Sequence, residues 1–517
     1  MRTKNSIKNI YINIISQIII ILLGFISRKV FLDNLGTQYL GVNGLLTNVL
    51  SLLSLAEGGI GTSIIYNLYK PLAKDNKDEV IALVQLYKKI YGILAIIVFI
   101  IGISIYPFLG IIMNGDVNIP NLLLVYLIFI IKNVISYLNA HKWSLINADQ
   151  KGYVLARVNL IFNIIITISK IIILKVTQDY VLYLIVELII FISQNIWNGR
   201  VVNIRYPYIK TNKKYKVKKE TRENLIINVK ALFLHNIGGY CVFGTDNLLI
   251  GGFINVITVG LYSNYTMIIG QLNGLITNIL YGIGSSVGNL IAIEKKEKVY
   301  EIFKVVNFIS FWIYSVGSIA LYNLIEPFID WAFGEGLLLD KLSLIILLIN
   351  FYLTGMRVAI NIFKSKAGIF SQDKYVPLLE ASINLGSSII LVKFLGLAGI
   401  FLGTTISTIS IPLWTQSKIV YNQIFNKSVK EYFKRYSLYI GLTLMSLLLV
   451  SSLCKVVVIS SKVIEIMLKG IISISIPSII YIIVFFKTKE FEYILSLIKP
   501  SISKINFKFK NILSKSI

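Results

Sequence analysis

Cysteine and histidine are almost absent from this chain of 517 residues, which has two of each. Cys241 and Cys454 are too few for a disulfide framework, and His141 and His235 lie far apart without neighbouring ligand residues. No phosphate-binding loop of the Gly-Lys-Ser or Gly-Lys-Thr type occurs, which argues against an ATPase on this chain. We therefore expect no metal and no cofactor, and any energy must come from a gradient or from another reaction.

Charged residues are also scarce, at 15%, whereas 56% of the residues are hydrophobic and the mean hydropathy is +0.75. Such apolar content exceeds what one soluble core can bury. The first long apolar stretch, Ile10 to Phe31, lacks a small-residue cleavage site and is too long for a signal peptide, so it is expected to remain as a membrane span. The chain is predicted to be an all-α polytopic membrane protein.

About fourteen stretches are long enough to span a bilayer, which takes roughly 20 apolar residues per helix. They lie near residues 8–32, 43–67, 84–108, 119–140, 153–174, 180–203, 225–251, 259–291, 303–325, 342–364, 375–395, 399–422, 435–455 and 464–486.

The connections between these spans alternate in charge, which predicts orientation because cytoplasmic loops are enriched in lysine and arginine. With a cytoplasmic N-terminus, the inner connections carry Lys70, Lys74, Lys77, His141, Lys142, Lys151, Arg205, Lys210, Lys213, Lys295, Lys296, Lys298, Lys364, Lys366, Lys374, Lys427, Lys430, Lys434 and Arg435. The outer connections carry Asp33, Asp116, Asp179, Glu326, Asp330, Glu335 and Asp340.

The net charge of +26 then reflects topology and attraction to anionic membrane lipid, and no nucleic-acid partner is expected. Both termini are predicted to be cytoplasmic, and residues 490–517 are expected to form a basic amphipathic tail on the membrane surface.

Short sequences recur at a nearly constant distance, which indicates a duplicated unit. The stretch Ala73 to Val80 matches Ala292 to Val299 at an offset of 219 (292 − 73), and the same offset relates Gly41 to Gly260. Because each copy holds six spans, both copies must have the same orientation in the membrane. We predict a six-helix lobe at 1–204, a basic linker at 205–224, a second lobe at 225–425, two additional helices at 426–489 and the tail at 490–517.

Polar residues recur along the spans at helical spacing. Asn13, Gln17, Gly24 and Arg28 lie at intervals of four, seven and four, which places them within a narrow arc of one helix. Similar stripes are Asn43, Thr47, Ser54 and Glu57; Asn228, His235, Gly239 and Asp246; Gln271, Asn278 and Asn289; Asn159, Asn163 and Lys170; Glu187, Gln194 and Asn198; Asn350, Arg357 and Asn361; and Glu380, Asn384 and Ser387.

These stripes have two interpretations. Small and polar residues also mediate ordinary helix packing in membranes. An ionised side chain, however, costs roughly 3 kcal/mol or more at the bilayer centre, so Arg28, Glu57 and Asp246 require a wet cavity or a buried partner. Lys170, Arg157 and Arg357 lie nearer span ends and can also reach the membrane surface. His235 suits either proton relay or a local hydrogen bond.

Several motifs together resemble those of bacterial polysaccharide flippases, which belong to a superfamily with the multidrug and toxin extruders and the lipid II flippase. The resemblance covers nearly the whole chain. The motifs are Gly24-Phe25-Ile26-Ser27-Arg28, Ala56-Glu57-Gly58-Gly59-Ile60-Gly61, Thr245-Asp246-Asn247 with Gly260-Leu261-Tyr262, and Gly368-Ile369-Phe370-Ser371-Gln372-Asp373.

The resemblance implies two six-helix lobes around a central cavity that opens alternately to each side of the membrane. It also implies transport of an undecaprenyl-diphosphate-linked oligosaccharide, with the two additional helices bordering a groove for the lipid tail. Arg28 would match a cavity arginine of such flippases, and arginine can hold diphosphate oxygens in a bidentate manner.

On this interpretation the headgroup would be held by Arg28, Lys170, Arg357, Gln17, Asn163, His235 and Gln271. Glu57, Asp246 and Glu380 would exchange a coupling H⁺ or Na⁺. A polysaccharide polymerase and glycosyltransferases are the expected protein partners.

Two alternatives remain. A drug or metabolite extruder of the same architecture would favour a cavity of carboxylates and aromatic residues, whereas the charges here are mixed. A membrane polymerase or ligase would need a substantial extracytoplasmic loop, and the longest outer connection, near 326–341, is short. No catalytic triad or metal constellation compensates, so we do not expect an enzyme.

Overall fold

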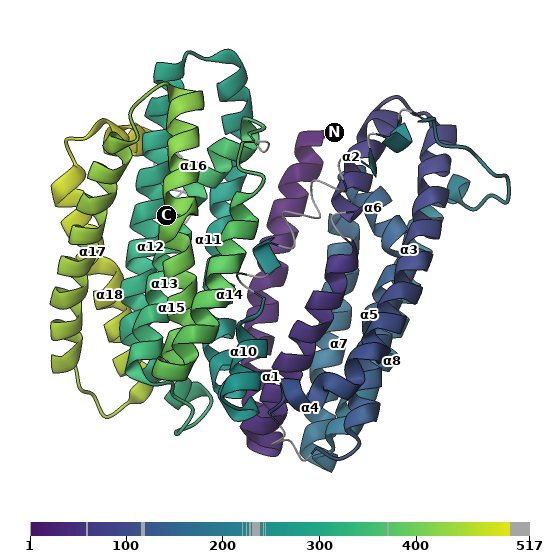
Figure 1. The fold of residues 1–517 in the computed structure, drawn as a ribbon, viewed down its shortest axis with the longest axis horizontal. Coiled ribbons are helices and arrows are strands. Elements are labelled where there is room, and N and C mark those ends of the chain that lie inside the picture. The colour runs from purple at the N-terminus through teal and green to yellow at the C-terminus, as the bar shows by residue number, and fades with distance from the viewer. Residues whose placement is uncertain are drawn as a thin grey trace, which may run out of the picture. The chain divides into compact units, whose positions relative to one another are not determined.

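The computed structural model describes residues 2–57, 60–114, 119–219, 221–223, 225–226, 229, 238–240, 242, 244–369 and 372–496 (Figure 1). Every regular element in these ranges is a helix, and none of them contains a strand. The all-α prediction is confirmed. Among the expected features, His235, Asp116 and most of the basic tail lie outside the described residues.

The first half of the chain forms long helices joined by short connections. They are α1 (Arg2–Ser54), η1 (Leu55–Glu57), α2 (Ile60–Ala73), α3 (Lys77–Ile105), η2 (Tyr106–Phe108), α4 (Leu109–Ile112), α5 (Leu122–Leu138), α6 (Ala140–Ala148), α7 (Tyr153–Thr177), α8 (Tyr180–Arg205), η3 (Pro207–Ile209) and α10 (Asp246–Phe253).

The second half has the same character. Its helices are α11 (Val256–Ile293), α12 (Lys296–Ala332), α13 (Lys341–Lys366), α14 (Val376–Leu395), α15 (Leu397–Ser410), α16 (Pro412–Val420), η4 (Tyr421–Phe425), α17 (Lys430–Val456) and α18 (Lys462–Phe485).

Ten helical segments in the described ranges are long and apolar enough to cross a membrane, or eleven if α5 and α6, bent by 46°, count as one span. All but one of the stretches predicted from hydropathy coincide with helices of the structure. The exception, near 225–251, includes twelve residues that lie outside the described ranges. The chain is therefore a multi-pass membrane protein.

Gly36 separates the first two predicted spans within the long helix α1. Its backbone has φ 78° and ψ −177°, a conformation that is essentially restricted to glycine because a Cβ would clash there. The chain therefore turns at Gly36, where the hydropathy pattern places the end of the first span.

The helix α7 shows how one span serves both lipid and protein. Its large exposed side chains recur at intervals of three and four residues, which defines one apolar face for lipid. The polar stripe of the same helix lies off this face. The exposed residues are Ile161, Ile165, Ile168 and Ile172, and the half-buried polar ones are Asn159, Asn163 and Lys170.

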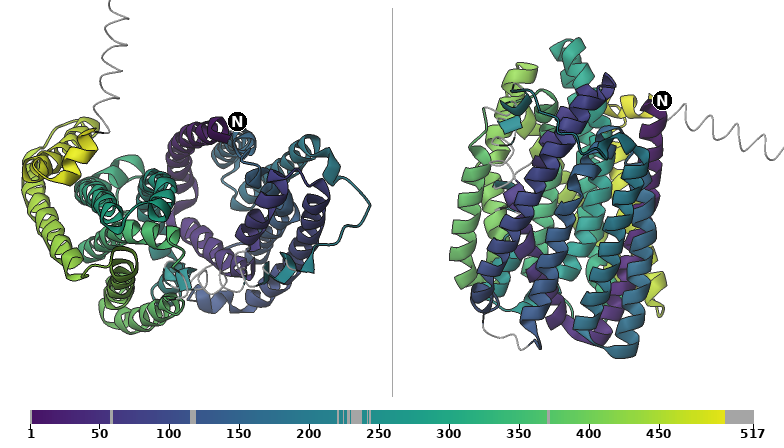
Figure 2. Two further views of the ribbon diagram at one scale, coloured as in Figure 1. Left: turned by 90° about the horizontal axis from the view of Figure 1, so that it is seen from above. Right: turned by 90° about the vertical axis from the view of Figure 1, so that its right-hand side faces the viewer.

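The chain divides into two compact units. The first contains Met1–Asn264, Ala332–Gly334 and Pro377–Gly403, and the second contains Tyr265–Trp331, Glu335–Val376 and Thr404–Ile517. In the first unit the helices α3, α5, α7 and α8 run side by side (Figures 1 and 2).

The basic connections of the first unit meet at one end of it. Lys151 pairs with Asp149 at 2.5 Å, and Tyr206, which follows α8, donates a hydrogen bond to the same carboxylate at 2.6 Å. Gln85 of α3 donates to the backbone oxygen of Lys213 at 2.8 Å. These contacts bring the connections α6–α7, α8–η3 and the start of α3 to one end, which we call the basic end.

The opposite, acidic end of the first unit carries Asp33 and Asp179 near the turns at Gly36 and before α8. Tyr39 and Tyr180, which flank these turns, lie 4.9 Å apart between ring centroids. The charge alternation predicted from the loops is therefore present in this unit.

The second unit repeats this separation of charge. Glu490, after α18, pairs with Arg435 at 2.7 Å and with Lys304 at 3.7 Å, so the starts of α12 and α17 share one end. Burial favours the neutral form of the Glu490 carboxyl, but the hydrogen bond from Arg435 lowers its pKa below the usual value. At the other end, Glu326 pairs with Lys341 at 2.8 Å.

Helix starts follow the repeat offset of 219 residues. α3 begins at Lys77 and α12 at Lys296 (296 − 77 = 219). The helical segment after Gly36 begins at Thr37, and α11 begins at Val256 (256 − 37 = 219). The duplication inferred from short strings is therefore also visible in the helix boundaries.

The equivalent glycines Gly41 and Gly260 form a reciprocal contact inside the first unit. A Cβ on Gly41 would lie 1.9 Å from the oxygen of Val256, and a Cβ on Gly260 would lie 2.2 Å from the oxygen of Thr37. The contact is the same in both directions, as at an interface with two-fold symmetry. Two equivalent helices therefore cross here at a distance that only glycine permits.

Candidate functional site

Three charged side chains from three helices form an ion-pair cluster inside the first unit. Lys132 of α5 and Lys170 of α7 both donate to the carboxylate of Glu187 on α8, the latter at 2.5 Å. The side chains of Lys170 and Glu187 are each only 16% exposed. One carboxylate thus serves two ammonium groups, so the cluster retains one excess positive charge.

Arg28 of α1 lies next to this cluster, and Tyr183 packs between them. The ammonium group of Lys170 lies 4.3 Å from the centroid of the Tyr183 ring, and that ring lies 5.4 Å from the ring of Phe31, three residues after Arg28 on α1. The Arg28 guanidinium donates to Ser263 Oγ at 2.9 Å and to Asn264 Oδ1 at 3.5 Å. Within the described ranges no carboxylate lies within 4 Å of it.

The site therefore holds three cations and one carboxylate among helices that cross the membrane. An uncompensated charge in such a place is costly unless water or an anion accompanies it. Arg28 and Lys170, two of the predicted headgroup residues, are brought together, and their excess positive charge is suited to an anionic group. We call Arg28, Lys132, Lys170 and Glu187 the cation cluster.

Glu57 lies apart from this cluster, in η1 at the break between α1 and α2. Its Oε1 accepts a hydrogen bond of 2.9 Å from the hydroxyl of Tyr91, whose ring stacks on Tyr137 with centroids 6.1 Å apart. In the part of the chain that the structure describes, no cation pairs with Glu57.

Asp246 opens the helix α10 and is held by another tyrosine. Its Oδ2 accepts a hydrogen bond of 3.2 Å from the hydroxyl of Tyr262. The other oxygen, Oδ1, is buried and has no hydrogen-bond partner among the described residues. A buried acceptor of this kind requires a proton, water or ion.

The remaining predicted site residues are distributed over both units. Arg357 of α13 is buried in the second unit, where it donates to Gln416 Oε1 at 3.3 Å. Glu380 of α14 is buried in the first unit. Gln17 on α1, Asn163 on α7 and Gln271 on α11 are half-buried.

The two interpretations of the cations near span ends can now be separated. Lys170 is ion-paired and Arg357 is buried, so neither side chain extends to the membrane surface. Arg157 is exposed and lies 6.0 Å from the Tyr153 ring, as expected for a residue at the start of α7. Of these three cations, only Arg157 fits the interpretation in which the side chain reaches the membrane surface.

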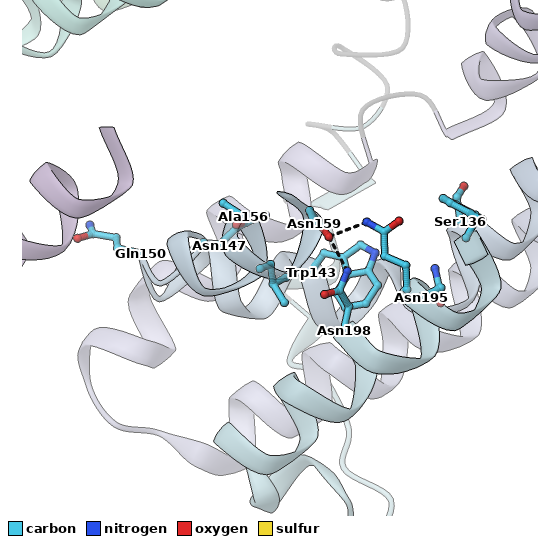
Figure 3. Close-up of a pocket in the computed structure, with 12 residues that line it drawn as sticks. Ser136, Trp143, Asn147, Gln150, Ala156, Asn159, Asn195 and Asn198 are labelled. Carbon is cyan, nitrogen blue, oxygen red and sulfur yellow. Dashed lines mark hydrogen bonds between the residues drawn. The ribbon is translucent and has the colours of Figure 1, made fainter. Parts of the chain in front are cut away.

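A polar pocket of about 680 Å³ lies towards the basic end of the same unit (Figure 3). Asn159 Oδ1 accepts two hydrogen bonds there, from Gln194 at 2.8 Å and from Asn198 at 2.7 Å. The lining has no charged side chain and six side-chain amides, from Asn147, Gln150, Asn159, Gln194, Asn195 and Asn198. Trp143 and Phe191 supply aromatic surface.

The sequence interpretation missed Lys132, which completes the cation cluster. A signal was present, because Lys132 is the one charged residue between Leu122 and Leu138 of α5. An ionisable residue in such an apolar segment is a functional candidate by default. Its pairing with Glu187, 55 residues away, could not be read from local spacing.

Replacing Glu187 by glutamine should destabilise the protein by about 3 kcal/mol, because the ammonium groups of Lys170, mostly buried, and Lys132, half-buried, would lose the one carboxylate that pairs with them among the described residues. The thermal unfolding of purified protein in detergent measures this loss. The matched control is Glu294→Gln, which breaks an exposed pair with Lys298 and should cost no more than about 0.5 kcal/mol. Equal stability of the two variants would contradict the buried cluster.

No family model matches the chain, and no curated protein matches its sequence. Solved structures do match. The lipid II flippase MurJ in an inward closed conformation has a TM-score of 0.64 at 14% identity, over 91% of this chain and 99% of that chain. An inward-facing multidrug resistance MATE family transporter has a TM-score of 0.56 at 14% identity, over 78% and 98%.

A third match is a transporter of the MOP superfamily from Pyrococcus furiosus, with a TM-score of 0.53 at 14% identity over 80% and 94% of the two chains. At these identities the likeness shows the fold. The chain has the fold of these three transporters. Among the three matches described, the likeness to the lipid II flippase covers the largest part of this chain.

Proposed function

We propose that the protein is a flippase for undecaprenyl-diphosphate-linked oligosaccharide repeat units, which it moves from the inner to the outer leaflet of a bacterial cytoplasmic membrane. The polymer served would be a capsule, an exopolysaccharide or a cell-wall polymer. The cation cluster carries this proposal, because three cations with one carboxylate suit a diphosphate. The fold shared with the lipid II flippase supports it.

Transport is proposed to occur by alternating access of two equivalent lobes, residues 1–204 and 225–425. The helix starts at an offset of 219 support their equivalence. The lobes are joined by the basic linker 205–224 and followed by two additional helices at 426–489. In this scheme the basic ends and both termini face the cytoplasm, where glycosyltransferases and a polymerase partner would make and use the substrate.

Ion coupling is assigned to the carboxylates outside the cation cluster. Glu57 and Asp246 each accept a hydrogen bond from a tyrosine and have no cation partner within the described ranges. Such groups can bind and release H⁺ or Na⁺ as the cavity opens to each side. Glu380, buried on α14, is the third candidate.

A reconstitution experiment tests the flippase proposal. Vesicles carrying the purified protein receive a fluorescent undecaprenyl-diphosphate disaccharide in one leaflet, and its arrival in the other leaflet is followed by quenching. We expect transfer that needs the protein and exceeds that of an uncharged lipid-linked disaccharide. Equal transfer of both lipids, or none above protein-free vesicles, would refute the proposal.

A drug extruder is the second candidate, because Glu57 beside Tyr91 and Tyr137 offers a carboxylate and aromatic rings to an organic cation. A deletion strain discriminates between the two candidates. Increased susceptibility to cationic drugs with unchanged surface polysaccharide would favour the extruder.

A further inference from the structure

The polar pocket lined by six side-chain amides, which we call the amide pocket, has a hydrogen-bonding pattern that ordinary helix packing does not require. Asn195, one of its lining residues, is satisfied internally, since its Oδ1 accepts from Asn139 at 2.6 Å and its amide donates to Ile135. Asn198 is different: its amide donates to Asn159, whereas its Oδ1 is buried and has no partner among the described residues. The residue itself is only 6% exposed.

Asn159 leaves a complementary group available. Its Oδ1 already accepts two hydrogen bonds, so its side-chain NH₂ remains a donor with no partner in the described part of the chain. The pocket thus presents an unused acceptor on Asn198 beside an unused donor on Asn159. A buried acceptor without a partner costs about 1–3 kcal/mol, which a ligand or water would recover.

The chemistry of the lining selects a class of ligand. Hydroxyl groups both donate and accept, as the pair of Asn159 and Asn198 requires. The volume of about 680 Å³ lies within the ordinary range for small-molecule sites, about 300–1,000 Å³. Trp143 and Phe191 offer apolar faces, and the lining has no charge with which to bind an ion. A neutral, hydroxyl-rich ring meets all of these conditions.

We propose that this pocket binds an uncharged sugar ring of the transported oligosaccharide, an inference that rests on the proposed flippase function. It thereby assigns neutral sugars, not uronic acids, to the part of the substrate that occupies this end of the unit. Asn159 donates to a sugar hydroxyl, Asn198 accepts from one, and Trp143 packs against the ring.

The pocket and the cation cluster occupy the same faces of α5 and α8. Lys132 and Ser136 of α5 are four residues apart, and Glu187 and Gln194 of α8 are seven residues apart. Seven residues are two helical turns, a rise of roughly 10 Å. The two sites therefore form one polar track, with amides towards the basic end and cations deeper, which matches a substrate with a neutral sugar and an anionic diphosphate.

Binding of free sugars to the full-length protein in nanodiscs tests the pocket. Ligand-observed NMR titrations compare two neutral disaccharides, diacetylchitobiose and maltose, with the anionic digalacturonate. At least one neutral disaccharide should bind tenfold more tightly than digalacturonate. Equal binding of all three, or binding of none, would overturn the proposal.

Two variants locate the binding. Asn159→Ala should weaken binding of the neutral disaccharide at least tenfold, and Asn198→Asp, which is close in size but charged, should do the same. Asn67→Ala is the matched control, since the Asn67 amide on α2 donates to Ser63 of its own helix and to no other described residue, and it should bind as wild type. Wild-type affinity in a folded Asn159→Ala or Asn198→Asp protein would contradict the assignment.

The vesicle assay distinguishes a failure of this inference from a failure of the flippase proposal. It also shows whether the pocket binds free sugar or the sugar of the lipid-linked substrate. In Asn159→Ala, transfer of the undecaprenyl-diphosphate disaccharide should fall about tenfold, whereas transfer of undecaprenyl diphosphate without sugar should be unchanged. Wild-type transfer of both lipids by this variant would overturn the pocket and leave the flippase standing. Sugar binding without any lipid transfer would refute the flippase and restrict the pocket to free sugars.

Discussion

The Arg28→Ala variant is expected to transfer the undecaprenyl-diphosphate disaccharide about tenfold to hundredfold more slowly than the wild type. Hydrogen bonds to a charged group contribute about 1.5–3 kcal/mol, which corresponds to a change of this size. Among the described residues the hydrogen-bond partners of Arg28 are neutral, namely Ser263 and Asn264, so its charge is available to an anion. The initial rate in the vesicle assay measures the effect.

A second substitution at position 28 tests whether a positive charge is sufficient or whether the planar guanidinium is needed. A substitution at position 157 is the control. Arg28→Lys retains the charge but loses the planar fork, and it should recover only part of the rate. Arg157→Ala removes an exposed arginine of α7 and should transfer lipid at the wild-type rate. An undiminished rate in Arg28→Ala, with the protein folded, would remove the residue from the substrate site.

The neutral partners of Arg28 leave its charge uncompensated before substrate arrives. Two side-chain oxygens from the start of α11 orient the guanidinium without neutralising it. Lys170, by contrast, already has Glu187 as a partner. The diphosphate is therefore expected to depend more strongly on Arg28 than on Lys170.

Hydropathy and charge were sufficient to predict most of this fold. The spans could be predicted because lipid requires long apolar helices. The separation of basic and acidic ends could be predicted from loop charges alone. Each of these features can be predicted from a single segment of the sequence, or from the order in which the segments follow one another.

The candidate site was less accessible to sequence reasoning, because its contacts join distant helices. Spacing identified Arg28 and Lys170 but gave Glu187 no role, and the pairing of Glu187 with Lys132 requires α5 and α8 to be neighbours. The amides of Asn159 and Asn198 were identified as a stripe, for which packing was an equal interpretation. The buried oxygen of Asn198, which has no partner among the described residues, helps to distinguish a pocket from packing.

Substituting either of the reciprocal glycines by alanine is expected to cost at least about 3 kcal/mol, at the upper end of the range for overpacking. The added Cβ would lie 1.9 Å from Val256 O in Gly41→Ala and 2.2 Å from Thr37 O in Gly260→Ala. Both obstacles are backbone atoms, so no side-chain rotation relieves them. Thermal unfolding in detergent, with the yield of folded protein, measures the loss.

The control is Gly92→Ala on α3, where an added Cβ has no neighbour within 4 Å. It should be neutral or stabilising by up to about 1 kcal/mol, because alanine favours a helix. Wild-type stability in Gly41→Ala would show that the two helices do not cross at the glycines.

The double variant Gly41→Ala/Gly260→Ala provides the stricter test of reciprocity. Because one crossing is responsible for both clashes, separating the helices for the first Cβ should also make room for the second. The combined loss should therefore be clearly smaller than the sum of the two single losses. Strict additivity would mean that the glycines act at independent sites, and the symmetric contact between the two copies of the repeat would have to be abandoned.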